Sequence, residues 1–138
     1  MKFSFREIPE PGLVTGRPRP IIDVVVDGLE IAPQACLLDS GATAVRFGMY
    51  VAELGGIDLS GAPSVELAVG GAIVTATMAE VSLSITDDAE SHEWTAPVWF
   101  CDPWRPSFGL LGLTGFFDQF SVTIDAYAGR IELTPVGS

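Results

Sequence analysis

Basic side chains are scarce in this sequence. Its 138 residues contain 7 Lys and Arg against 18 Asp and Glu, which gives a formal net charge of −11. Phosphate backbones and anionic lipid surfaces repel a protein of this charge. We therefore expect neither a nucleic acid nor a membrane as a partner. The length fits one compact domain with a core of its own.

Long apolar runs are also missing. No uninterrupted stretch approaches the ~18 residues that a membrane-spanning helix needs. The first residues, 1–7, lack the apolar segment of a secretory signal. The sequence thus predicts a soluble, cytoplasmic protein.

Cysteine and histidine are almost absent. Cys36, Cys101 and the single histidine, His92, cannot complete a four-ligand structural zinc site. No phosphate loop, dinucleotide fingerprint or Cys-x-x-Cys pair is present, so we expect no metal and no cofactor. The apolar surroundings of both cysteines favour buried free thiols, with a disulfide as the alternative. His92 stands in a predicted polar loop over residues 87–93, where a histidine is usually solvated, and we assign it no role.

Basic residues and prolines gather at the N-terminus. Residues 1–20 hold four of the seven basic residues and four of the ten prolines. Because proline discourages helix, we interpret residues 1–20 as an irregular or extended arm and residues 21–138 as the single domain. The positive arm favours attraction to the acidic remainder, within a subunit or between subunits. A solvated terminus is the alternative.

Short runs of alternating apolar and polar residues, bounded by glycine turns, make up most of the remaining chain. The predicted strands cover residues 21–26, 29–38, 65–69, 73–77, 81–85, 94–101, 120–125 and 130–134. Turns are expected at Asp27-Gly28 and at Gly70-Gly71. A short helix is predicted over 49–54, ended by Gly55-Gly56, with at most one more. The fold class is therefore mainly β.

An apolar strand leads directly into an acidic residue and a glycine turn at Leu37-Leu38-Asp39-Ser40-Gly41-Ala42-Thr43. A polar side chain at a strand end, beside a backbone bend, is well placed to act as a reactive group. By itself, Asp-Ser-Gly is also an ordinary turn sequence. A second motif, Phe108-Gly109-Leu110-Leu111-Gly112, predicts a buried strand that another backbone approaches closely.

In this order, the two motifs resemble those of the retropepsin-like aspartic proteases, particularly their bacterial single-domain members. The resemblance runs from about Ile21 to Leu133 and includes the short helix, the Gly70-Gly71 hairpin and the segment 116–125. It departs at Leu113-Thr114, where many relatives carry a polar pair. The resemblance implies a retropepsin-like acid protease fold, a closed β-barrel with one or two short helices.

The resemblance also implies an aspartic endopeptidase with Asp39 as its catalytic residue. This chemistry needs two carboxylates, one to deprotonate the attacking water and a protonated one to polarise the scissile carbonyl. No other aspartate is followed by Ser-Gly or Thr-Gly. A homodimer that acts on an extended polypeptide substrate is therefore implied, with Asp39 from each subunit. Because the two carboxylates share a proton, we expect an acidic to near-neutral pH optimum.

The same resemblance gives roles to the neighbours of Asp39. The Ser40 hydroxyl would donate to the main chain of the partner subunit, and Gly41 would let backbone approach the carboxylates. Ala42 supports the turn without adding a hydroxyl. Gly70 and Gly71 match the family's flap, which closes over the peptide. An ordinary surface hairpin is the alternative for these two glycines.

Three tryptophans, Trp94, Trp99 and Trp104, fall in or just after one predicted strand. Alternating aromatic residues in a strand are typical of a core or of a subunit interface. Interface burial would also account for the low charged fraction of 18%. A wall that contacts bound peptide is the alternative.

Two other functions share features with this sequence. Chymotrypsin-like serine proteases carry Asp-Ser-Gly at their nucleophile, but here His92 follows Ser40, Ala42 replaces the expected glycine, and the length does not allow two barrels. A catalytically inactive retropepsin-like domain, serving as a peptide-binding or scaffolding module, is the alternative to the enzyme. The intact Asp39 favours the enzyme, because an unpaired charge in a tight apolar turn is costly.

Overall fold

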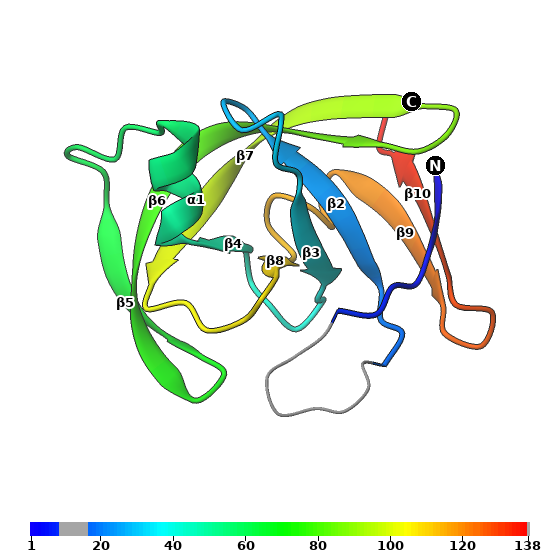
Figure 1. Ribbon diagram of the computed structural model, residues 1–138, viewed down its shortest axis with the longest axis horizontal. Coiled ribbons are helices and arrows are strands. Elements are labelled where there is room, and N and C mark those ends of the chain that lie inside the picture. Colours follow the sequence, from blue (N-terminus) through cyan, green and yellow to red (C-terminus); the bar gives the residue numbers. More distant parts are fainter. Residues whose placement is uncertain (9–16, 138) are drawn as a thin grey trace.

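The structure, a computed structural model, describes residues 1–8 and 17–137. In this part of the chain we find ten strands and one helix (Figure 1). In order these are β1 (Lys2–Ser4), β2 (Ile21–Val26), β3 (Gln34–Leu38), β4 (Val45–Gly48), α1 (Met49–Gly55), β5 (Ser64–Val69), β6 (Ala72–Thr86), β7 (Ser91–Asp102), β8 (Gly109–Leu111), β9 (Phe120–Asp125) and β10 (Arg130–Pro135).

Six strands close into a barrel. They follow the order β2-β3-β8-β4-β7-β6, and a further pairing between β2 and β6 completes the ring. Strand β5 pairs with the first half of β6, and together they form a hairpin that projects from the barrel (Figure 1). Side chains that alternate along the strands fill the barrel interior. In β2, for example, Ile22, Val24 and Val26 are buried while Asp23 is exposed. The expectation of a mainly β, closed-barrel fold with one or two short helices is confirmed.

The helix α1 begins and ends close to its predicted limits. Val51 and Ala52 are buried, and Gly56 caps the C-terminus in the left-handed conformation with φ 67°. An ordinary side chain is strained there, so glycine is the residue that ends the helix cleanly. Helix α1 is the only one in residues 1–8 and 17–137, and it is too short to cross a membrane.

The predicted hairpin after β2 forms with a longer connection. The return strand was expected from residue 29, but β3 begins at Gln34. Leu29 instead turns inward and is buried, and Pro33 has no N–H to donate to a ladder. The end of β2 pairs with β6 rather than with β3, at Val25↔Ser84 and Val26↔Leu83.

Strands β6 and β7 form one long antiparallel ribbon. The two strands predicted over 73–77 and 81–85 are a single strand, and β7 begins at Ser91, earlier than expected. The predicted polar loop is confined to 87–90, where the Asp87 carboxylate accepts the main-chain N–H groups of Ala89 and Glu90. The ladder continues to Thr86↔Ser91, which places His92 within β7.

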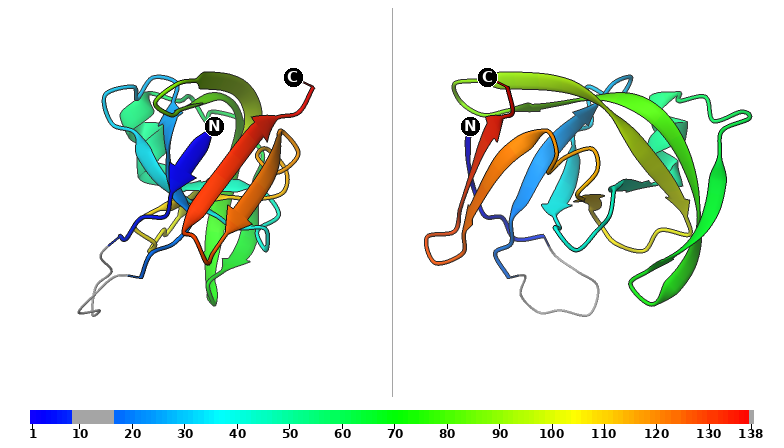
Figure 2. Two further views of the ribbon diagram at one scale, coloured as in Figure 1. Left: turned by 90° about the vertical axis from the view of Figure 1, so that its right-hand side faces the viewer. Right: turned by 180° about the vertical axis from the view of Figure 1, so that it is seen from behind.

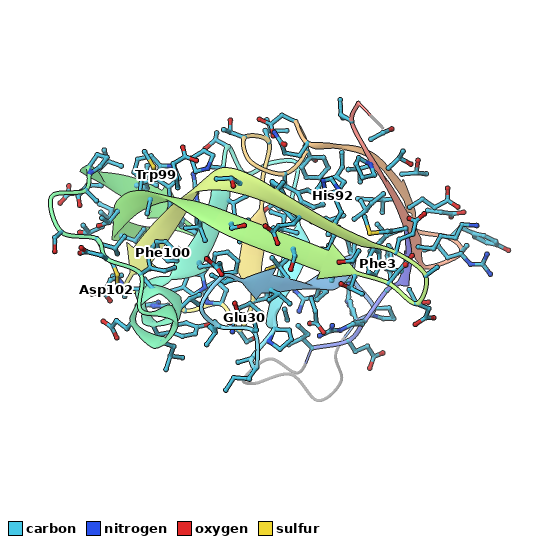
Figure 3. The ribbon with its side chains drawn as sticks, turned by 90° about the horizontal axis from the view of Figure 1, so that it is seen from above. Phe3, Glu30, His92, Trp99, Phe100 and Asp102 are labelled. Carbon is cyan, nitrogen blue, oxygen red and sulfur yellow. The ribbon has the colours of Figure 1, made fainter. Side chains whose placement is uncertain are left out.

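His92 is half-buried, so the prediction of a solvated loop histidine is wrong (Figure 3). Its ring stacks on Trp94 at 6.1 Å between centroids and meets the edge of Phe120 at 5.3 Å. Trp94 is buried in the core and donates from Nε1 to the carbonyl oxygen of Gly115 at 2.7 Å. These contacts join the start of β7 to residues 115–120, and the local sequence does not reveal them.

A separate sheet with the order β1-β10-β9 flanks the barrel (Figure 2, left). Strand β1 is antiparallel to β10, with Phe3 opposite Ile131. The first residues of the predicted N-terminal arm therefore form an outer strand of this sheet. Residues 9–16 of that arm lie outside the described residues.

Candidate active site

The turn that follows β3 presents Asp39, and we call residues 39–44 the Asp39 turn. Within β3, Cys36 and Leu38 are buried in the barrel, so the strand ends firmly anchored. The N–H of Asp39 donates to the carbonyl oxygen of Leu111 at 3.0 Å, and its carbonyl oxygen accepts the N–H of Ala42 at 3.0 Å. Strand β8 therefore fixes the first residue of the turn.

Asp39 is half-buried, and the turn itself orients its carboxylate. The N–H of Gly41 donates to Oδ1 at 2.9 Å. In the described part of the chain, no other hydrogen bond reaches this carboxylate and no basic side chain forms an ion pair with it. Oδ2 thus remains available for a water molecule, a substrate or a second carboxylate.

Strand β8 lies between β3 and β4 and holds both ends of the Asp39 turn. It is parallel to β3, with Leu38 opposite Leu111, and touches β4 at Arg46↔Leu110. Beyond β8, the N–H of Leu113 donates to the carbonyl oxygen of Ala42 at 3.0 Å. The N–H of Thr114 donates to the carbonyl oxygen of Thr43 at the same distance. The turn is therefore held by main-chain hydrogen bonds along its length.

Gly112 allows these two segments to approach. A Cβ at this position would lie 2.6 Å from the carbonyl oxygen of Ala42 and 2.7 Å from the nitrogen of Ala44. Real Cβ atoms essentially never come so close to backbone, so only glycine fits. The prediction that another backbone closely approaches the segment 108–112 is confirmed, and the approach occurs at Gly112.

The β5–β6 hairpin turns at Gly70-Gly71, with φ of 57° and 81°. Both residues are exposed and occupy the left-handed region that favours glycine. Figure 1 shows the tip of this hairpin, the loop after β7 and the Asp39 turn on the same lower side of the barrel. The structure thus brings the predicted flap and the predicted catalytic turn to one end of the molecule.

A cavity of about 290 Å³ lies between the hairpin and the loop of residues 103–108, which we call the Trp104 loop. Its lining comprises Val69, Gly70, Ala72, Val74, Pro103, Trp104, Arg105, Pro106 and Phe108. Asp39 is not among these residues. Phe108 connects the cavity to the Asp39 turn, because it packs with Ala42 and Leu110 in one small apolar cluster. Trp104 donates from Nε1 to the carbonyl oxygen of Phe108 at 3.2 Å.

The expected core location is confirmed for Trp94, whereas Trp99 and Trp104 are half-buried. Trp94 belongs to the core, and Trp104 lines the cavity beside the hairpin. Trp99 is half-buried and packs on a small cluster that includes Cys101 (Figure 3).

Within residues 1–8 and 17–137, no group of three or more His, Cys, Asp or Glu side chains could hold a metal ion.

Both cysteines are free and buried, as predicted. Burial raises the pKa of the Cys36 thiol well above its ordinary value. Burial also raises the pKa of Cys101 to about 11, against a smaller opposing effect of the Arg46 charge. Neither thiol is therefore prepared to act as a nucleophile at neutral pH.

Sequence reasoning missed Arg46 as a residue near the site. It follows the Asp39 turn within β4, between the buried side chains of Val45 and Phe47. A single basic residue inside an otherwise apolar strand was the available signal. Its partners across the sheet, Leu110 on β8 and Trp99 on β7, are evident only from the register.

No protein-family model matches the sequence, and no curated protein matches it. Among the solved structures, one similar chain is a retropepsin-like aspartic protease from Rickettsia conorii, with a TM-score of 0.53 and 15% sequence identity. The match covers 80% of this chain and 76% of the other. At this identity the likeness concerns the fold. The chain therefore has the fold of a retropepsin-like aspartic protease.

Proposed function

We propose that this protein is an aspartic endopeptidase that acts as a homodimer, with Asp39 of each subunit in one shared active site. The observation that carries the proposal is the arrangement of Asp39, which projects from a turn held by β8 with Oδ1 bound to Gly41 and Oδ2 without a partner in the described residues. The likeness to a retropepsin-like aspartic protease supports it.

The chemistry explains why a second copy is needed. One ionised carboxylate accepts a proton from water while the oxygen of that water attacks the scissile carbonyl carbon. The other carboxylate is protonated and donates a hydrogen bond to the carbonyl oxygen. Collapse of the tetrahedral intermediate breaks the C–N bond, and a proton passes to the leaving amine. A twofold axis beside Asp39 supplies both carboxylates from identical chains.

The neighbours of Asp39 have supporting roles in this proposal. Ser40 is exposed, and its hydroxyl donates across the twofold axis to the partner's main chain. Gly41 orients the carboxylate through its N–H. Ala42 is buried against Phe108 and Leu110 and fixes the floor of the turn.

An extended polypeptide is the proposed substrate. It lies between the Asp39 turn and the β5–β6 hairpin, and Gly70 and Gly71 let the hairpin close over it. The apolar cavity beside the Trp104 loop accepts one of its side chains.

The test is cleavage of a diverse peptide mixture between acidic and neutral pH, with products identified by mass spectrometry. We expect cuts with the wild-type protein and none with Asp39→Asn. Asp88→Asn is the matched control, because Asp88 is exposed and lies in the loop between β6 and β7. Absence of cuts in a preparation that ultracentrifugation shows to be dimeric would contradict the proposal and favour a peptide-binding module without turnover.

A further inference from the structure

Arg46 lies on the face of β4 that points away from the barrel interior. Val45 and Phe47, its neighbours in the strand, are buried in the main core, so alternation directs Arg46 to the opposite side. Arg46 is opposite Leu110 on β8, and Leu110 is opposite Leu37 on β3. Residues directly opposite in a sheet face the same side. Arg46 therefore shares a face with these two leucines.

This face is the one that carries the Asp39 turn and the cavity. Leu37 and Leu110 belong to the small cluster with Ala42 of the turn and Phe108 of the cavity wall. The guanidinium of Arg46 is held beside the turn, because Nη2 donates to Oγ1 of Thr43 at 3.0 Å. The positive charge is thus placed at the edge of the candidate active site.

The guanidinium lacks a counter-ion among the described residues. It has five N–H donors, and Nε is covered by protein without an acceptor. The ion pairs in residues 1–8 and 17–137 involve the Met1 ammonium, Lys2 and Arg6, and none involves Arg46. A half-buried charge without a partner is costly. In a chain with 18 acidic side chains, a missing carboxylate partner at this position points to a carboxylate from a ligand.

The distance from Asp39 suits a bound peptide. Strands β3 and β4 are separated by two strand spacings, about 10 Å in total, and Arg46 is level with Leu37, two residues before Asp39. An extended peptide rises about 3.3 Å per residue, and the long side chains of Arg46 and of a substrate Glu cover the remaining distance. A peptide whose scissile bond lies at Asp39 therefore reaches Arg46 within about three residues. Arg105 is a second basic residue on this side of the molecule, where it lines the cavity between the hairpin and the Trp104 loop.

Resting on the proposed function, we propose that Arg46 selects polypeptides that carry Glu or Asp within about three residues of the scissile bond. The Nη atoms of Arg46 donate charge-assisted hydrogen bonds to the substrate carboxylate, while Thr43 fixes the orientation of the guanidinium. A bound peptide thereby supplies the carboxylate counter-ion that Arg46 lacks among the described residues.

The primary experiment compares matched peptides with both ends blocked, so that only a side chain can supply the carboxylate. Each pair differs by Glu or Gln at one position, from three residues before the scissile bond to three after. We expect kcat/KM of the wild-type protein to favour Glu by about tenfold at one position. Equal values for Glu and Gln at every position would overturn the inference, without any need for a variant.

Variants then assign the preference to Arg46. In Arg46→Gln the Glu to Gln ratio falls to about one, and Arg46→Lys retains part of it. Arg130→Gln, an exposed change of the same charge on β10, keeps the wild-type ratio. A ratio that Arg46→Gln leaves intact would overturn the assignment.

A binding measurement separates this inference from the proposed function. Fluorescence anisotropy of the same labelled peptides is recorded with the Asp39→Asn protein, which does not cut them. If the wild-type protein cleaves nothing, the endopeptidase proposal fails. The role of Arg46 is still decided, because about tenfold tighter binding of the Glu peptide supports it and equal binding overturns it.

Discussion

The N–H of Asp39 donates to the carbonyl oxygen of Leu111 at 3.0 Å, which joins the end of β3 to a strand far away in the chain. Leu111 is fully buried, so this hydrogen bond ties the position of the candidate catalytic residue to the barrel core. The backbone of Asp39 is therefore fixed, although the residue is only partly buried.

Gly112→Ala is expected to destabilise the fold. The new methyl group would meet the backbone of Ala42 and Ala44, which cannot move without disturbing the Asp39 turn. We expect a loss of about 3 kcal/mol in the free energy of unfolding, measured by urea denaturation. Gly55→Ala is the control, since a Cβ there meets nothing closer than 3.7 Å and alanine favours helix. Equal stability of the two variants would contradict the close approach.

Mixing wild-type subunits with Asp39→Asn subunits is expected to abolish activity in the mixed dimers. If one carboxylate from each chain is required, an equal mixture at exchange equilibrium retains about one quarter of the activity of fully wild-type dimers at the same total subunit concentration. The measurement is peptide cleavage after co-incubation. Retention of about one half would mean that each subunit works alone.

Asp87 is expected to remain ionised to unusually low pH. The N–H groups of Ala89, Lys2 and Glu90 donate to its carboxylate and lower its pKa. Because the folded pKa is lower than the unfolded one, the stabilising effect is present above the unfolded value of about 3.9 and is lost as pH falls through the folded pKa. NMR titration of the carboxyl carbon measures this pKa. A midpoint at or above the unfolded value would show that these bonds do not persist.

The two cysteines are expected to resist thiol reagents in the folded protein. Burial raises the pKa of both thiols, so at pH 8 the reactive thiolate is rare and covered. Stability from these thiols is fully present below the unfolded pKa of about 8.5 and declines as pH rises above it. The measurement is the rate of labelling with a disulfide reagent, with and without urea. Fast labelling of Cys101 in the native protein would contradict its burial.

Local pattern was enough to predict much of the fold and the Asp39 turn. The alternation in 120–125 and 130–134 became β9 and β10, and the glycine pair after residue 54 ended α1. The sequence alone showed Asp39 at the end of an apolar strand and Gly112 beside a second strand. Side-chain period and glycine conformations are properties of a few adjacent residues, so they are legible in sequence.

Tertiary structure alone decided which distant residues meet. His92 became half-buried because Phe120, from another strand, packs against its ring. The place of Arg46 beside the candidate site depends on its register with Leu110, which pairs two strands that lie far apart in the chain. Register between distant strands is set by closure of the whole core and not by neighbours in the chain. For this reason the sequence by itself determined that Asp39 follows an apolar strand at a glycine turn, whereas only the folded barrel decided that Arg46 shares a sheet face with Leu37 and Leu110.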